Sequence, residues 1–166
     1  GERAVVAPGV SVYAVASAHE ELRTDTEGNH HFLGYVIETD AGVLYHSGDC
    51  APYPGLVAAL KGRGIDLALV PVNGRDEHRR SHGILGNFTF SEAVDLCLDA
   101  GIPSMITCHF GMFDFNTVDE STLDREIAEA SGSLQCARPA PGRVYELITE
   151  AGSMPHGPEL TKGTPR

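Results

Sequence analysis

The segment Tyr45-His46-Ser47-Gly48-Asp49 ends a β-rich run in a small turn and a carboxylate. Residues 42–46 alternate in the manner of a strand, and the turn Asp40-Ala41-Gly42 joins them to a similar run at residues 32–39. Loops that leave the carboxyl ends of strands are where α/β folds place their functional sites. The segment therefore predicts a β-hairpin with a candidate site at its end.

On either side of this hairpin the pattern changes from paired strands to strands that alternate with helices. Further strands are predicted at residues 10–15, 65–72, 103–108 and 144–148. Helices are predicted at residues 53–60, from Thr89 or Ser91 to Gly101, and at residues 117–130. This order predicts an α/β fold with a mixed sheet and flanking helices, in one domain over residues 1–150. Residues 73–89 are expected to form a long loop, and residues 151–166 a loose tail.

The composition limits the classes of partner. A formal net charge of -11 repels nucleic acid and anionic membranes, so neither is an expected partner. No apolar run approaches the roughly 20 residues that span a bilayer, and no signal peptide pattern opens the sequence. The four cysteines lie far apart without a Cys-x-x-Cys motif, which favours a reducing cytoplasm over a disulfide framework. Cys97 and Cys108 lie in apolar segments and are predicted to be buried thiols.

Three strand ends carry residues that commonly bind metals. His19 follows the strand at 10–15, Asp49 follows the hairpin, and His109 follows the strand at 103–108. Imidazole nitrogens and a carboxylate from three such ends could converge on a divalent ion. Each residue also has a structural alternative, since a lone strand-end histidine is more often hydrogen-bonded within the fold. The loop histidines, His30-His31 and the pair His78 and His82, are interpreted as surface residues.

In order and spacing, several segments together resemble one branch of the metallo-β-lactamase superfamily, the branch that contains the L-ascorbate-6-phosphate lactonases. The resemblance covers roughly residues 8–148. The matching segments are residues 18–20, 32–36, 45–49, 66–76 and 107–113. The segments that resemble this branch in particular are residues 72–76, 86–89 and 112–117.

This resemblance implies the αββα sandwich, with a metal site in the cleft at one edge. It implies His19, Asp49 and His109 as metal ligands, with Asp49 able to bridge two ions of zinc or manganese. On this model the bound metal turns a water molecule into a hydroxide nucleophile near neutral pH. Asp49 and His109, which would hold that metal, are then the candidate catalytic residues. Ser47 and Cys50 lack an evident base beside them in the sequence and are interpreted as structural.

The implied substrate is a small phosphorylated sugar-acid lactone, which the hydroxide opens to a hydroxy acid. Asn73, Arg75 and Asp76 are the candidate substrate contacts, because a guanidinium matches the geometry of phosphate. Arg75, Arg79 and Arg80 also form a local cationic stretch that suits a small anionic ligand. The alternative is that Arg75 and Asp76 pair with each other and brace the loop.

The sequence departs from the superfamily pattern at its most diagnostic motif. His-x-His-x-Asp-His does not occur among the eight histidines. The resemblance therefore implies the C-terminal portion of the fold with only part of the metal site, and this chain alone is expected to be inactive. The inner face of the sheet would be left as an apolar patch, so a homo-oligomer is expected. A phosphodiesterase or other hydrolase of this fold, or an inactive binding or oligomerisation domain, are the alternative functions.

Overall fold

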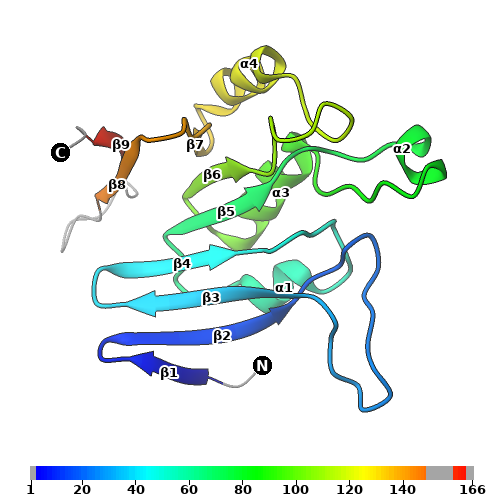
Figure 1. The fold of residues 1–166 in the computed structure, drawn as a ribbon. Coiled ribbons are helices and arrows are strands. Elements are labelled where there is room, and N and C mark those ends of the chain that lie inside the picture. Colours follow the sequence, from blue (N-terminus) through cyan, green and yellow to red (C-terminus); the bar gives the residue numbers. More distant parts are fainter. Residues whose placement is uncertain (1–2, 149–158, 164–166) are drawn as a thin grey trace.

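The computed structural model describes residues 3–148 and 159–163 (Figure 1). A seven-stranded sheet has the order β1-β2-β3-β4-β5-β6-β7, and β8 and β9 form a separate two-stranded sheet. The strands are β1 Arg3–Ala7, β2 Val10–Ala16, β3 Leu33–Thr39, β4 Gly42–His46, β5 Leu67–Pro71, β6 Ser104–Cys108, β7 Gln135–Ala137, β8 Val144–Ile148 and β9 Glu159–Gly163. The helices are α1 Leu56–Leu60, α2 Glu77–Ser81, α3 Phe90–Ala100 and α4 Glu120–Ala130.

The large sheet is mixed, as the sequence predicts. Strands β1 to β4 form an antiparallel meander, and β4, β5, β6 and β7 pair in parallel. Since β2 and β4 run in the same direction, the carboxyl ends of β2, β4, β5 and β6 all lie at one edge of the sheet. This edge carries the segments that the sequence singled out as candidate sites.

Helices cover one face of the sheet, with α1 and α3 packed behind it in Figure 1. The buried side chains of this core are contributed by strands and helices alike; they include Val15, Val36, Tyr45, Val70 and Met105 from the sheet and Leu56, Leu60, Phe90, Ala93 and Leu96 from the helices. Fully burying one side chain of this size stabilises the fold by about 1.5–3 kcal/mol. Strand β5 lies between β4 and β6 and is buried in this core, which explains why its sequence is a continuous apolar run.

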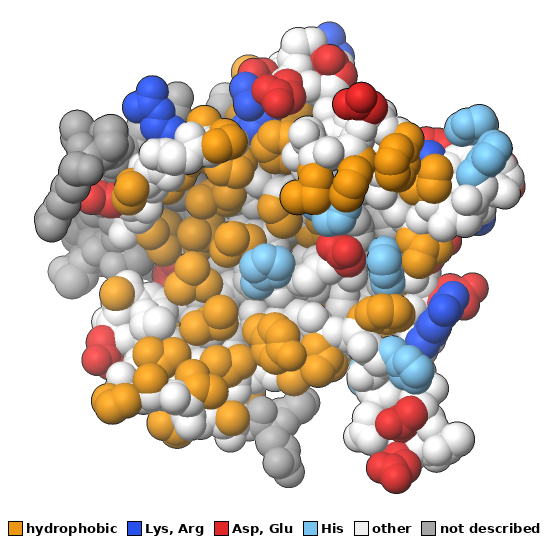
Figure 2. All heavy atoms as spheres, in the orientation of Figure 1, with side chains coloured by type: hydrophobic (Ala, Val, Ile, Leu, Met, Phe, Trp, Pro, Cys, Tyr) orange, Lys and Arg blue, Asp and Glu red, His pale blue; other side chains and the backbone are white. Residues whose placement is uncertain are grey.

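The opposite face of the sheet is apolar and is not covered by any helix or strand in the described part of the chain (Figure 1). Cross-strand partners on this face include Ala14 with Tyr35, Tyr35 with His46, and Leu69 with Ile106. Leu33 and Tyr35 are exposed there, and Figure 2 shows hydrophobic side chains spread over much of the face in view. This agrees with the apolar inner face expected from the resemblance.

Residues 73–89 were expected to form only a loop, and that expectation is wrong for their centre. The short helix α2 lies there, because the Asp76 side chain accepts a hydrogen bond from the Arg79 amide at 2.8 Å and caps its first turn. Arg79 pairs with Asp76, and Arg80 with Glu77, each three residues apart. Capping and local ion pairs thus make a helix in a segment without apolar periodicity.

The sequence patterns missed some short strands and placed the starts of two helices too early. The strands β1 and β7 were not predicted, and the helices α1 and α4 begin three residues later than expected. Within the segment expected to be a loose tail, Glu159–Gly163 forms β9, which pairs with β8. The rest of that segment lies outside the described residues.

We expect the uncovered sheet face to cause self-association that depends on protein concentration, because it presents a contiguous apolar surface. The double variant Leu33→Lys with Tyr35→Lys should shift the distribution toward smaller species in sedimentation velocity. Leu98→Lys, at an exposed position on α3 and thus away from this face, is the matched control and should leave the distribution unchanged. An unchanged distribution in the double variant would contradict the assignment of this face as the associating surface.

Candidate functional site

Hydrogen bonds between neighbouring strand ends assemble the candidate site. The Ser17 hydroxyl donates to the Asp49 carbonyl at 2.7 Å, and the Ala51 amide donates to the Ala18 carbonyl at 2.7 Å. The Val72 amide donates to the Cys108 carbonyl at 3.0 Å. The first two bonds hold the segment before His19 against Asp49, and the third holds the end of β5 against the end of β6.

Two glycines allow the turn after β4 to lie close to β3. A Cβ atom at Gly34 would lie 2.8 Å from the His46 carbonyl oxygen and 2.7 Å from that of Ser47. Gly48 has a φ of 64°, and a Cβ atom there would lie 2.8 Å from the Leu33 carbonyl oxygen. Only glycine fits both positions without a shift of backbone, so these residues fix where Asp49 leaves the sheet.

Asp49 and His109 are in contact at this edge. The Nε2 atom of His109 lies 3.5 Å from Oδ1 of Asp49, and both side chains are accessible to solvent. Figure 2 shows histidine side chains gathered around an acidic side chain on the face in view. The structure therefore brings together two of the three predicted metal ligands.

The backbone is strained beside this pair. His109 has a φ of 59° and Glu20 a φ of 66°, and they are the only residues other than glycine with positive φ in the described part of the chain. Such conformations cost of order 1–3 kcal/mol and persist where the surrounding structure enforces them, often at functional sites. One of these residues is a predicted ligand, and the other directly follows a predicted ligand.

His19 lies at the same edge, and its ring packs edge-on against Phe32 with the ring centroids 5.4 Å apart. The described residues contain no group of three or more His, Cys, Asp or Glu side chains that could hold a metal ion. Asp49 and His109 fit a divalent ion in kind, because they offer an oxygen and a nitrogen donor. They fall short in number, since a catalytic zinc takes three protein ligands.

Arg75 and Asp76, two of the predicted substrate contacts, have other partners in the fold. The Arg75 guanidinium donates to both carboxylate oxygens of Glu92 at 2.6 Å, and to the Asn87 carbonyl at 3.0 Å. Asp76 caps α2 and accepts from Nε of Arg79 at 2.6 Å. The two residues thus brace the loop through separate partners instead of pairing with each other.

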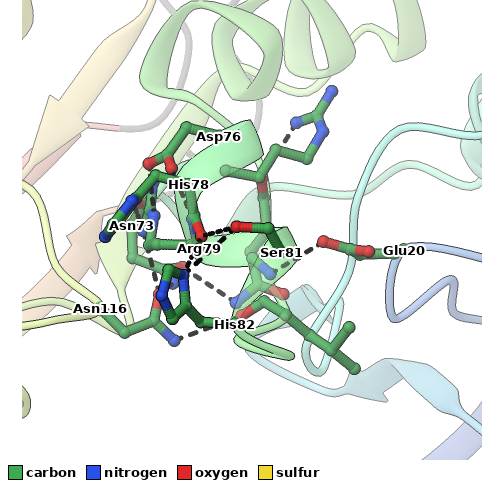
Figure 3. Close-up of polar contacts among 12 residues, drawn as sticks. Glu20, Asn73, Asp76, His78, Arg79, Ser81, His82 and Asn116 are labelled. Atoms are coloured by element: carbon green, nitrogen blue, oxygen red, sulfur yellow. Dashed lines mark hydrogen bonds and ion pairs between the residues drawn. The ribbon is translucent and has the colours of Figure 1, made fainter.

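Asn73, the third predicted substrate contact, is buried in a chain of side-chain amides (Figure 3). Asn87 donates to Asn73 at 2.9 Å, and Asn73 donates to Asn116 at 2.8 Å. Arg79 donates to the Asn116 side chain at 3.0 Å and to the Asn73 carbonyl at 2.9 Å. This network joins the three segments that resemble the lactonase branch in particular.

The sequence patterns did not indicate the roles of Arg79, Asn87, Glu92 or Asn116. Arg79 and Asn116 are 37 residues apart in the sequence, and Arg75 and Glu92 are 17 residues apart. The one available signal was that Asn87 and Asn116 lie in the segments matching the lactonase branch. Spacing along the chain could not show that these segments meet.

The cysteines and Ser47 do not form a nucleophilic site. Burial, and secondarily the charge of Asp49, raises the pKa of the half-buried Cys108 thiol to about 12. Burial also raises the pKa of Cys50. Ser47 is buried and donates to the Gly48 carbonyl at 2.7 Å. Cys97 is buried as expected, whereas Cys108 is less enclosed than the sequence predicted.

The fold, the strand-end site and the sequence now define the class of protein. The model of the beta-lactamase superfamily domain matches residues 1–110. The chain belongs to this family. Its mixed sheet with flanking helices is that of metallo-β-lactamase-fold structures.

Two relatives have names that describe an activity. The chain is 29% identical over 116 residues to a UPF0173 metal-dependent hydrolase of Myxococcus xanthus (strain DK1622), with 69% of this chain and 38% of the relative covered. It is 26% identical over 147 residues to a UPF0173 metal-dependent hydrolase of Methanospirillum hungatei JF-1, with 86% of this chain and 62% of the relative covered. The chain therefore spans about half the length of these curated relatives.

Solved structures share the fold at lower identity. Igni18, a metallo hydrolase from Ignicoccus hospitalis, superposes with a TM-score of 0.64 at 15% identity over 99% of this chain and 58% of that one. YhfI from Bacillus subtilis, a metallo-beta-lactamase fold protein, gives a TM-score of 0.60 at 13% identity over 98% of this chain and 53% of that one.

No helix in the described part of the chain combines the length and apolar character needed to cross a membrane.

The ion pair between Arg75 and Glu92 should make stability depend on pH. Burial alone would raise the pKa of Glu92, but hydrogen bonds from Arg75 and Thr89 outweigh it and hold that pKa below its ordinary value of 4.5. A carboxylate with a lowered pKa stabilises the fold above its unfolded pKa, and this stabilisation is lost as the pH falls through the folded pKa. Glu92→Gln should therefore be less stable than wild type at pH 7, with the difference shrinking below about pH 4.

Urea unfolding of the two proteins across this range measures the effect. Arg75→Gln, which removes the other half of the pair, is the matched variant and should also lose most of its disadvantage at acid pH. A constant difference between wild type and Glu92→Gln across the range would show that the pair does not set the acid sensitivity.

Proposed function

We propose that this chain carries part of the active site of a metal-dependent hydrolase that opens a lactone ring. The observation that supports this most is the contact between the Asp49 carboxylate and the His109 imidazole at the strand-end edge. Membership of the beta-lactamase superfamily and the names of the two curated relatives agree with a metal-dependent hydrolase. The lactone comes from the resemblance of the segments around residues 72–76, 86–89 and 112–117.

Asp49 and His109 would hold a divalent ion, zinc or manganese, and such an ion would supply Lewis-acid polarisation of a carbonyl oxygen and a bound water of lowered pKa. Ser17 and the glycine turn at Gly48 keep the Asp49 backbone in place. In the reaction, water adds to the lactone carbonyl carbon, the ring C–O bond breaks, and the released oxygen takes a proton to give the hydroxy acid. The exposed Asp49 carboxylate can accept the proton that the water loses.

Two donors do not complete a catalytic metal site, which takes three protein ligands. We therefore propose that residues 3–148 alone do not complete the active site. His19 is the third candidate ligand in this chain, and the remaining ligands of a site for two ions would belong to the full-length enzyme.

A phosphate on the lactone would need a cationic side chain to bind it. Arg75, the cation predicted for this role, is already paired with Glu92. Arg75 makes two hydrogen bonds of 2.6 Å to Glu92, and a phosphate would have to displace this carboxylate. Arg79 and Arg80 also pair with carboxylates, Asp76 and Glu77 respectively. We therefore propose that the site recognises the lactone ring itself and that Arg75 braces the loop beside it.

We also propose a reducing, cytoplasmic location for the enzyme. All four cysteines are free thiols. Disulfides form and persist mainly in oxidising compartments, so unpaired cysteines in a chain with four of them favour the cytoplasm.

The metal site is tested by removing one donor at a time. Asp49→Asn and His109→Gln should each lower metal-dependent hydrolysis of γ-butyrolactone by the full-length protein at least about 100-fold, because each removes a ligand. Titration in a pH-stat with added Mn²⁺ or Zn²⁺ measures the rate. His78→Gln, at an exposed position on α2, is the control and should keep the wild-type rate. Full activity in either donor variant would refute the site.

The role of Arg75 is tested on a pair of lactones that differ only in a phosphate. Arg75→Ala should reduce kcat/KM by the same factor for both lactones, because the variant removes a brace of the loop and does not remove a substrate contact. Glu92→Gln breaks the same ion pair from the other side and should also affect both lactones equally. A loss confined to the phosphorylated lactone in Arg75→Ala would show instead that Arg75 binds the phosphate.

A further inference from the structure

The loop after His109 presents three large apolar side chains to solvent. Met112, Phe113 and Phe115 are 77%, 46% and 61% exposed. The rings of Phe113 and Phe115 are stacked, with their centroids 5.5 Å apart. Figure 2 shows hydrophobic side chains beside the gathered histidines. Contiguous apolar surface of this kind usually marks a place where a ligand or partner binds.

This loop is fixed at both ends, so the exposure of its side chains is built into the fold. The Gly111 amide donates to the Thr117 hydroxyl at 2.6 Å and closes the base of the loop. The backbone amide of Asn116 donates to the Phe113 carbonyl at 3.0 Å. The Asn116 side chain joins the amide network through Asn73 and Arg79, as Figure 3 shows. An anchored loop cannot easily fold its apolar side chains back into the core.

The place of the loop relates it to the candidate site. It begins directly after His109, whose backbone is held in the left-handed region, and it lies at the edge of the sheet that carries Asp49. The arginines of the neighbouring loop, Arg75 and Arg79, point their charges at Glu92 and Asp76. The loop after His109 therefore offers a substrate apolar contacts and the exposed Asp114 carboxylate, whereas the charges of these two arginines are already paired.

We propose that Met112, Phe113 and Phe115 bind an apolar substituent of the lactone, an aryl or branched alkyl group, and so determine which lactone is hydrolysed. This inference rests on the proposed lactonase activity at Asp49 and His109. The stacked rings offer flat faces and edges that suit another ring. The unbranched thioether of Met112 can adapt to the shape of the substituent.

The experiment compares γ-butyrolactone with γ-phenyl-γ-butyrolactone as substrates of the full-length protein with added metal. In the double variant Phe113→Ser with Phe115→Ser, kcat/KM for the phenyl lactone should fall about tenfold while that for the unsubstituted lactone is unchanged. Leu98→Ser is the matched control, because Leu98 lies on α3 and is 46% exposed, as Phe113 is. The control should leave both values unchanged.

A second measurement separates this inference from the proposed function. Ligand-observed NMR with Zn²⁺ present compares binding of 4-hydroxy-4-phenylbutanoate and 4-hydroxybutanoate, the ring-opened acids, and needs no turnover. If wild type hydrolyses neither lactone, the lactonase proposal fails. A preference for the phenyl acid that the double variant loses would still support the apolar contact.

Three results would overturn the inference. The first is an equal loss, or no loss, on both lactones in the double variant. The second is a wild-type protein without preference for the phenyl acid. The third is a change of oligomeric state in the double variant with unchanged selectivity, since the loop would then contact another protein chain.

Discussion

The parallel pairing of β4, β5 and β6 is the constraint on which the candidate site depends. Leu44 pairs with Leu67, and Leu69 pairs with Ile106, so the three strands end at the same edge. Asp49 and His109 lie far apart in the sequence, and this pairing brings their side chains to 3.5 Å. The antiparallel meander of β2, β3 and β4 adds the segment of His19 to the same edge. Strand direction thus positions every predicted metal ligand.

Polar side chains around this edge serve mainly to hold loops in place. Glu92 neutralises Arg75 and Asp76 neutralises Arg79. The buried Asn73 and the half-buried Asn116 connect the loops after β5 and β6. A cationic stretch that suggests an anion site in the sequence is therefore largely an internal brace. The loop that follows His109 exposes the apolar side chains of Met112, Phe113 and Phe115, together with the carboxylate of Asp114. This arrangement is the reason that we propose an apolar lactone, instead of a phosphorylated one, as the substrate.

Local sequence patterns were sufficient to predict the strands and helices that have regular apolar periodicity or a recognisable capping residue. The strands β2 to β6 follow from alternating or continuous apolar runs, and the sequence left Thr89 and Ser91 open as the cap of α3. The structure selects Thr89, because its side chain and that of Glu92 form a capping box. The helix α2 could not be predicted from periodicity, since its stability comes from the Asp76 cap and ion pairs. Strand β7 has three residues, too few for a pattern.

For the site, the sequence predicted which residues follow the strands but not which partners they meet. Asp49 and His109 were predicted because polar residues at strand ends gather at one edge of a parallel sheet. The partner of Arg75 was missed because Glu92 lies in the first turn of a helix that had no evident relation to the loop. The contact between Asn73 and Asn116 spans 43 residues and depends on two loops folding together. Such contacts follow from tertiary structure alone.

The central claim is that His109 and Asp49 together bind a divalent metal ion. The most direct measurement follows the imidazole nitrogens of ¹⁵N-labelled histidines by NMR during titration with Zn²⁺, with His109→Gln used to assign the His109 signals. We expect the Nε2 signal of His109 to shift when zinc is added, and Asp49→Asn to weaken this response. A response of exposed histidines such as His78 and His82, without any response of the His109 nitrogens, would contradict metal binding by Asp49 and His109.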